Sequence, residues 1–330
     1  MSLSSLTIRQ LLSEARQKLD AARVDAPANT SRVLLAQAMG QSKAWLAAHD
    51  EDTPAAEAIA TFQNMLARVM AHEPFFYVLG HREFYGLDLL VDPRVLIPRP
   101  ETEMLVELAL EQMKTEDERR KTEITSPPSP VPRLMDVGTG SGAVPIAIAK
   151  RAPQVQLIAT DVSGDALDVA RENARRHGVA DRITFLQANL LDGVPEGAEI
   201  VTANLPYVSP EEIDVLPPEI AAHEPRVALD GTGDGLGLIR KLLTQIAARP
   251  GIKAAFLEFG ASQGRDVLAA AQQLVPSAHA EIKKDLAGLD RVLILHRTDG
   301  RRRTEDGQAT VPGLPSSVTS NQPQATSNQQ

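Results

Sequence analysis

Residues 134–151 read LMDVGTGSGAVPIAIAKR, in which a short apolar run, a glycine-rich loop and a second apolar run follow one another. This order is typical of a buried strand, a tight turn and a helix that bring the backbone close to a nucleotide-like ligand. Glycines in the turn remove side chains where the ligand must approach. We therefore predict a cofactor-binding loop made of Gly138, Thr139, Gly140, Ser141 and Gly142.

Strand and helix patterns alternate along the chain after this loop. Such alternation predicts a mostly parallel sheet covered by helices on both faces, the Rossmann-like α/β class. The predicted strands are residues 133–137, 156–160, 183–187, 200–203, 254–259 and 291–295, and the predicted helices are residues 143–151, 164–177, 234–248 and 262–274.

Residues 1–73 have helical patterns instead and predict a small N-terminal helical bundle. One helical stripe consists of Ile8, Leu12, Ala15, Leu19 and Ala22. Pro27 breaks this pattern, and we expect Thr30 or Ser31 to cap a second helix that ends at Gly40. Further helices are predicted at residues 43–48 and 55–71. The residues alone leave two interpretations open, a structural appendage or a substrate-docking module.

Residues 74–98 are predicted to form a β-hairpin that links the bundle to the α/β domain, residues 99–298. The hairpin rests on two β-like runs, residues 75–80 and 84–91. Pro98 and Pro100 then precede a predicted helix over residues 101–113.

Two other segments are predicted to be irregular. Residues 114–132 are charged and then proline-rich, which indicates a solvated surface loop inserted in the α/β domain. Residues 299–330 are polar with few large apolar side chains, which predicts a disordered tail.

The composition excludes several function classes. The chain contains no cysteine, so it has no disulfide, thiolate metal site or cysteine nucleophile, and its seven histidines show no zinc-hydrolase spacing. No metal site is therefore expected. A net charge of −9 is unlike that of a bulk nucleic-acid binder, which usually carries a basic surplus. Without a signal peptide or a membrane-spanning apolar run, we expect a cytoplasmic protein.

The acidic residues around the loop bear on which cofactor it holds. Asp161 is predicted at the end of the next strand, where a carboxylate accepts hydrogen bonds from both ribose hydroxyls of a nucleoside. The spacing Gly138-x-Gly140-x-x-Ala143 also fits the loose dinucleotide fingerprint, so the loop alone leaves NAD open. Asp136 favours S-adenosyl-L-methionine, because a carboxylate just before the loop can attract the cationic amine of its methionine part.

The sequence Asn204-Leu205-Pro206-Tyr207 follows the fourth strand and has no role in hydride transfer. An amide nitrogen is a poor nucleophile, so its lone pair must be aimed at the methyl carbon by two acceptors that hold its two hydrogens. The Asn204 side-chain oxygen and a backbone carbonyl, that of Leu205, are the predicted acceptors. Pro206 stiffens the turn, and Tyr207 is expected to lie against the planar substrate.

Several motifs together make residues 1–298 resemble the protein-(glutamine-N5) methyltransferases, and within them the release factor glutamine methyltransferases (the PrmC/HemK family). The segments that carry the resemblance are residues 80–85, 96–103, 136–142, 204–207 and 224–229, and LIPRPETE at 96–103 is the most specific of them. The resemblance implies a class I S-adenosyl-L-methionine-dependent methyltransferase, active on the Gly-Gly-Gln glutamine of bacterial peptide-chain release factors. It also implies an N-terminal domain that docks the factor.

The resemblance also implies residue roles and shows two departures. Residues 138–142 and Asp161 would hold the cofactor, residues 204–207 the glutamine amide, and residues 99–102 would flank the methionine end. The family usually has proline where this chain has Leu205 and an acidic residue where it has Asn189. Asn189 or Leu190 would contact adenine, since an asparagine oxygen can still accept from the adenine amine.

Two alternative substrates remain open, a glutamine of a ribosomal protein and an amino group of a nucleic-acid base. The second must be extracted from its stack and usually requires a basic target-recognition region. The acidic balance and the helical N-terminal domain disfavour it, so no direct nucleic-acid partner is expected. The enzyme is expected to act as a monomer.

Overall fold

A computed structural model of the chain describes residues 6–122 and 134–297. The predictions for residues 123–132 and for the polar tail lie outside these described residues. The N-terminal part contains the helices α1 (Ile8–Ala21), α2 (Pro27–Met39), α3 (Lys43–Ala48), α4 (Ala56–Met70) and α5 (Phe75–Leu79). Among the described residues no helix is both long and apolar enough to cross a lipid bilayer.

The predicted bundle is confirmed, and its helices share one apolar core. Ile8, Leu19 and Phe62 are almost completely buried in this core. Along α1 the buried position is Leu11, whereas the predicted Leu12 is only partly buried. Thr7 caps α1 with a reciprocal capping box through Gln10.

The predicted cap of the second helix was wrong. Pro27 begins α2, because its fixed φ and its missing N–H suit the first helical position. Thr30 and Ser31 are buried within the helix, where their hydroxyls donate to backbone carbonyls of the preceding turn. Gly40 ends α2 in the left-handed conformation, as predicted.

The predicted hairpin was only half right. The aromatic run at residues 75–79 is the helix α5, which follows Pro74 and ends at the left-handed Gly80. Tertiary burial of Tyr77 and Val78 overrides the strand propensity of these residues. The hairpin itself is formed by the antiparallel strands β1 (His81–Phe84) and β2 (Leu87–Leu90).

The α/β domain begins with the short helix η2 (Pro100–Thr102) and α6 (Glu103–Thr122). The helix predicted to end at 113 therefore extends into the segment predicted to be a surface loop. Its strands are β3 (Leu134–Val137), β4 (Leu157–Asp161), β5 (Ile183–Gln187), β6 (Ile200–Asn204), β7 (Ala254–Glu258), β8 (His279–Lys284) and β9 (Asp290–His296). Its remaining α-helices are α7 (Ala143–Arg151), α8 (Gly164–Arg176), α9 (Pro210–Ile213), α10 (Pro218–Ala221), α11 (Gly237–Ala247) and α12 (Gly264–Leu274).

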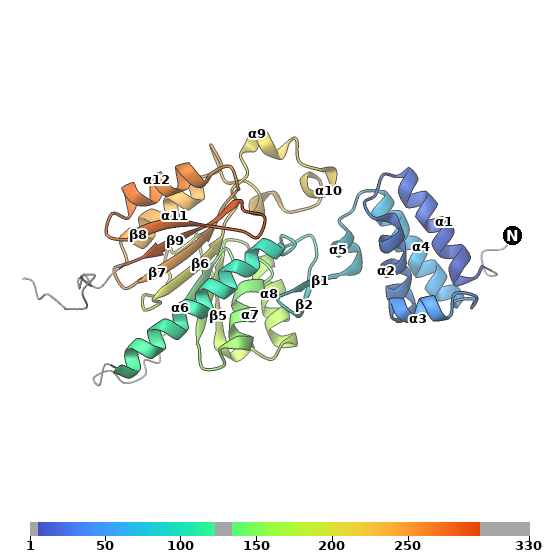
Figure 1. The fold of residues 1–330 in the computed structure, drawn as a ribbon, viewed down its shortest axis with the longest axis horizontal. Coiled ribbons are helices and arrows are strands. Elements are labelled where there is room, and N and C mark those ends of the chain that lie inside the picture. The colour runs from blue at the N-terminus through green and yellow to red at the C-terminus, as the bar shows by residue number, and fades with distance from the viewer. Residues whose placement is uncertain (1–5, 123–133, 298–330) are drawn as a thin grey trace, which may run out of the picture. The chain divides into compact units, whose positions relative to one another are not determined.

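The seven strands form one sheet in the order β5-β4-β3-β6-β7-β9-β8. The first five are parallel, and β9 and β8 extend the sheet in antiparallel register. Helices α6, α7 and α8 cover one face and α11 and α12 the other, which gives the three predicted layers (Figure 1). The strand β8 was not predicted, because its sequence HAEIKK is mostly polar, as is common in an edge strand.

The chain order of the sheet reverses between β3 and β6. From β3 the chain continues outward to β4 and β5, and it then crosses back to β6 on the other side of β3. In an open α/β sheet, ligands bind at such a reversal, beyond the carboxyl ends of the strands. The glycine loop follows β3 and the Asn-Leu-Pro-Tyr turn follows β6, so the topology places both motifs there.

Candidate functional site

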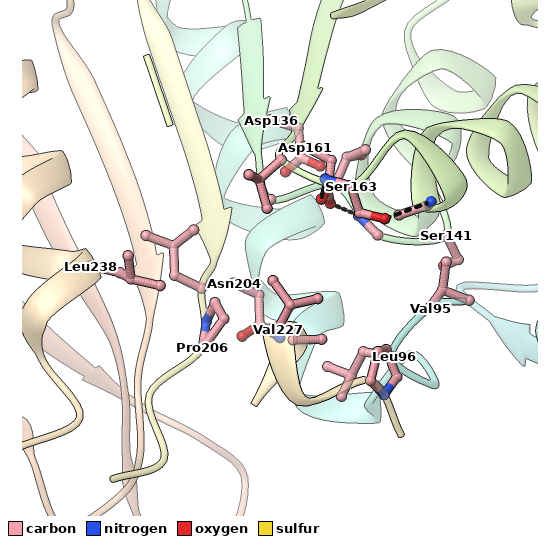
Figure 2. Close-up of a pocket in the computed structure, with 18 of the residues that line it drawn as sticks. Val95, Leu96, Asp136, Ser141, Asp161, Ser163, Asn204, Pro206, Val227 and Leu238 are labelled. Atoms are coloured by element: carbon pink, nitrogen blue, oxygen red, sulfur yellow. Dashed lines mark hydrogen bonds between the residues drawn. The ribbon is translucent and has the colours of Figure 1, made fainter. Parts of the chain in front are cut away.

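A cavity of about 570 Å³ opens at the carboxyl ends of β3, β4 and β6. Ten of the predicted site residues line it: Gly138, Thr139, Gly140, Ser141, Asp161, Asn189, Leu190, Asn204, Leu205 and Pro206. Figure 2 shows how Asp161, Asn204 and Val227, which come from separate segments, surround this space. The cavity has the size and mixed polarity of a nucleoside-binding site.

Backbone geometry explains why this loop contains three glycines. Gly138, Gly140 and Gly142 all have positive φ angles, which glycine adopts without strain. A Cβ at Gly138 would lie 3.0 Å from Leu205 Cδ2, and one at Gly142 would lie 2.9 Å from Ile146 Cδ1. A Cβ at Gly140 would meet no protein atom within 4 Å. Gly138 and Gly142 therefore allow close packing, whereas Gly140 leaves its space open to a ligand.

Asp161 ends β4 and connects the loop to the next helix. Its Oδ2 accepts from Gly140 N and its Oδ1 from Ser163 N, both at 2.9 Å. Burial raises the pKa of its carboxyl, and the backbone hydrogen bonds oppose that rise. Since each carboxylate oxygen has two lone pairs, acceptor capacity remains for a ligand hydroxyl.

Asp136 is less accessible than the sequence suggested. It lies within β3, is 3% exposed, and its Oδ1 accepts from Thr202 Oγ1 at 2.7 Å. Burial raises its pKa to about 6. It still contributes to the cavity wall, so it can act on a ligand cation.

Asn204 ends β6 with a defined side-chain orientation. Its Nδ2 donates to Thr102 Oγ1 at 2.9 Å, and no described residue donates to its Oδ1. The amide oxygen is therefore the acceptor that remains for a ligand. The structure thus places Thr102, which was expected near a methionine end, directly beside Asn204.

Tyr207 does not line the cavity with the rest of its turn. Its backbone oxygen accepts from Gln263 Nε2 at 2.8 Å, and its side chain is largely shielded, which raises the pKa of its phenol. An added Cβ at Gly260 would lie 3.2 Å from Tyr207 Cδ2, so the glycine makes room for the ring. Gly142 also lies outside the lining, where it precedes α7 and packs against Ala170.

Asn189 and Leu190 line the cavity after β5. Leu190 has a φ of +58°, unusual for a residue with a side chain, and its carbonyl accepts from Thr160 Oγ1 at 3.3 Å. This hydrogen bond and the burial of Leu190 hold the unfavourable conformation at the edge of the cavity.

Two buried acids of this region were not singled out from the sequence. Glu224 accepts from Arg99 at the cavity rim, and Glu258 ends β7 directly opposite Asn204. Glu224 could have been found as the first residue of the family segment 224–229. Glu258 is the last residue of the strand AAFLE, whose other residues are apolar, and no sequence signal distinguishes it.

Comparisons with known proteins agree with this geometry. The family model of the PrmC N-terminal domain matches residues 10–80, and that of the methyltransferase small domain matches residues 125–231. The release factor glutamine methyltransferase of Moorella thermoacetica is 37% identical over 298 residues, covering 89% of this chain and all of the relative. This chain belongs to the release factor glutamine methyltransferase family.

Other members of the release factor glutamine methyltransferase family show the same extent of similarity. The one from Nitratidesulfovibrio vulgaris is 34% identical over 306 residues, covering 90% of this chain and 97% of that relative. Among solved structures, the catalytic domain of human METTL16 in complex with an RNA hairpin has a TM-score of 0.51 at 15% identity, covering 76% of this chain and 84% of that chain. This likeness supports the methyltransferase fold, and the enzyme is an S-adenosyl-L-methionine-dependent methyltransferase.

Proposed function

We propose that the enzyme methylates the side-chain amide nitrogen of the glutamine in the Gly-Gly-Gln motif of bacterial peptide-chain release factors. The observation that carries this proposal is the free Oδ1 of Asn204 at the wall of the cavity that the glycine loop enters. Relatives that cover nearly the whole chain and are named release factor glutamine methyltransferases support the substrate.

The cavity residues fit S-adenosyl-L-methionine. Gly140 leaves open space in the loop where the cofactor would approach the protein backbone, and Asp161 would accept from the ribose hydroxyls. Asn189 and Leu190 would contact adenine. Asp136 would attract the methionine amine from within the wall, and residues 99–102 would flank that end. When bound, the cofactor supplies a methyl group on a positively charged sulfur.

The chain's own residues would orient the substrate amide. Asn204 Oδ1 and the Leu205 carbonyl would each accept one hydrogen of the glutamine NH2 and so aim its lone pair. Leu205 is buried against Gly138, which fixes the turn although this chain lacks the usual proline there. Tyr207 would flank the glutamine side chain. The methylated nitrogen becomes acidic and loses its proton easily, so orientation and charge stabilisation carry the catalysis.

The N-terminal bundle completes the proposal. We assign residues 1–73 to substrate docking, which fits the match of residues 10–80 to the PrmC N-terminal domain. We place the linker at residues 74–98 and the catalytic domain at 99–298. The enzyme is proposed to act in the cytoplasm, as a monomer and without direct nucleic-acid contact.

Mass spectrometry tests the substrate. Purified enzyme, S-adenosyl-L-methionine and a release factor are incubated, and the Gly-Gly-Gln peptide is expected to gain one methyl group. A release factor with this glutamine replaced by alanine is the matched control. Methylation of a ribosomal-protein glutamine or of nucleic acid, with the release factor unmodified, would refute the proposal in favour of the corresponding alternative.

A further inference from the structure

Glu258 is a buried acid that the reaction scheme above does not use. It is the last residue of β7, its Cα is paired with that of Asn204 on β6, and it is 1% exposed. Its Oε2 has no hydrogen-bond partner among the described residues. Burying a carboxyl oxygen without a partner costs stability, so this acid calls for a functional explanation.

Thr102 connects this acid to Asn204. Its hydroxyl accepts from Asn204 Nδ2 at 2.9 Å, and its side chain lies close enough to the Glu258 carboxyl to lower the pKa of that acid. A threonine hydroxyl has a single proton to donate. When that proton points to Glu258, only the lone pairs of Thr102 face Asn204, and they accept from an NH2 group but cannot bond an oxygen.

We propose that Glu258 is a positioning residue, whose carboxylate acts through the Thr102 hydroxyl to hold Asn204 with its Oδ1 toward the substrate amide. This inference rests on the proposed function, because that function assigns the substrate amide to Asn204. A carboxylate only accepts hydrogen bonds, so it fixes the direction of the Thr102 proton. A protonated carboxyl can donate to Thr102. The Thr102 proton is then free to point to Asn204, which allows the Asn204 side-chain amide to flip.

The groups around Glu258 place the reversal of the Thr102 hydrogen bond near neutral pH. Burial raises the pKa of Glu258 to about 7. The charged groups that face it are Arg291 of β9 and Arg99, which lower the pKa, and Glu101 of η2, which raises it; the Tyr207 phenol also lies near. The rate of methyl transfer should therefore rise with pH through this range.

Four variants separate positioning from a purely structural role. Glu258→Gln cannot ionise, and Thr102→Val removes the hydroxyl but keeps the shape of the side chain. Thr102→Ser keeps the hydroxyl. The Thr102→Val/Glu258→Gln double variant tests whether the effect of Glu258 depends on the Thr102 hydroxyl. Single-turnover rates at saturating substrate would be measured from about pH 5.5 to about pH 9. Cofactor dissociation constants and circular dichroism spectra would be recorded for each variant.

The wild-type rate is expected to increase up to about tenfold per pH unit and to level off above about pH 7. Glu258→Gln should lose this dependence, and Thr102→Val should lower kcat at least about tenfold with cofactor affinity changed less than about threefold. Thr102→Ser should retain the wild-type rate, and the double variant should be no slower than Thr102→Val. A Glu258→Gln profile that still follows the wild type, or an unchanged kcat in Thr102→Val, overturns the inference.

A measurement without substrate keeps this test separate from the proposed function. Carbon-13 NMR of glutamate-labelled enzyme should show one carboxyl that titrates near neutral pH and is missing in Glu258→Gln. Because Thr102 lowers the pKa of Glu258, Thr102→Val should move that titration to higher pH. An unmethylated release factor with wild-type enzyme would count against the proposed function alone, whereas an unchanged titration in Thr102→Val refutes the link to Glu258.

Discussion

Arg99 Nη2 donates to both carboxylate oxygens of Glu224, at 2.9 and 2.8 Å, across 125 positions of sequence. Each residue belongs to a proline-containing segment of the cavity rim, Pro98–Pro100 on one side and Glu224–Pro225 on the other. The Glu224 side chain is 1% exposed and that of Arg99 is 31% exposed. The ion pair therefore joins two walls of the cavity.

Glu224→Ala should lower the free energy of unfolding by about 1–3 kcal/mol, because it leaves Arg99 partly buried without its partner. It should also speed release of S-adenosyl-L-methionine, since the two walls are no longer joined. Chemical denaturation and stopped-flow release would measure these effects. In a double-mutant cycle with Arg99→Ala, purely additive losses would contradict a coupling between the two residues.

Alanine substitutions at Gly140 and Gly142 should have different effects. Gly140→Ala should lower the free energy of unfolding by about 1 kcal/mol, because alanine is strained at a positive φ, but the protein should still fold, since the added methyl group meets no protein atom. The methyl group would occupy the space assigned to the ligand, so the cofactor should bind at least about tenfold more weakly. Gly142→Ala would crowd Ile146 and Ala170 and should destabilise the fold by about 2–3 kcal/mol. Thermal unfolding and calorimetric titration distinguish the two. Normal cofactor affinity in Gly140→Ala would contradict its assignment to the ligand space.

The sequence predicted the part of the fold that repeats a regular pattern. Buried parallel strands and amphipathic helices leave a periodic signal, so β3 to β7 and the longer helices α7, α8, α11 and α12 were found to within a few residues, whereas the one-turn helices α9 and α10 were not predicted. The run at 75–79 was assigned to strands because its aromatic residues favour them, whereas packing and the flanking Pro74 and Gly80 make it helical. The strand β8 had no apolar signal to detect.

The site was predictable where function depends on backbone geometry. The glycine loop and the turn at Asn204 are continuous in sequence and carry recognisable residues. Thr102, Glu224 and Glu258 reach the site through contacts between distant segments, such as the pairing of β6 with β7 that brings Glu258 opposite Asn204. A single sequence does not contain these pairings, so the two buried acids beside the site became visible only in three dimensions.

Asn204→Ala should abolish glutamine methylation, by at least about 10²-fold in kcat, because the substrate amide loses a fixed acceptor that orients it. Cofactor binding should change little, since the proposed ribose and adenine contacts belong to other segments. Methyl transfer would be followed by mass spectrometry and cofactor binding by calorimetry. Leu205→Pro, which introduces the usual family residue, is the matched control and should retain activity. Robust activity of Asn204→Ala would remove the central residue of the proposed mechanism.

Glu258→Gln should stabilise the protein at alkaline pH. Burial raises the pKa of Glu258 from the ordinary value of 4.5 to about 7, so between these values the folded state binds more protons than the unfolded state. The wild type therefore loses stability at this site as pH rises through that window, by about 2–3 kcal/mol in total. The glutamine variant does not titrate there, and Asp136, whose pKa is also raised, is common to both proteins and cancels in the difference. Urea denaturation at about pH 5 and about pH 8 should show that the free energy of unfolding of the variant, relative to that of the wild type, increases with pH. A difference independent of pH would show that Glu258 does not ionise in the folded protein.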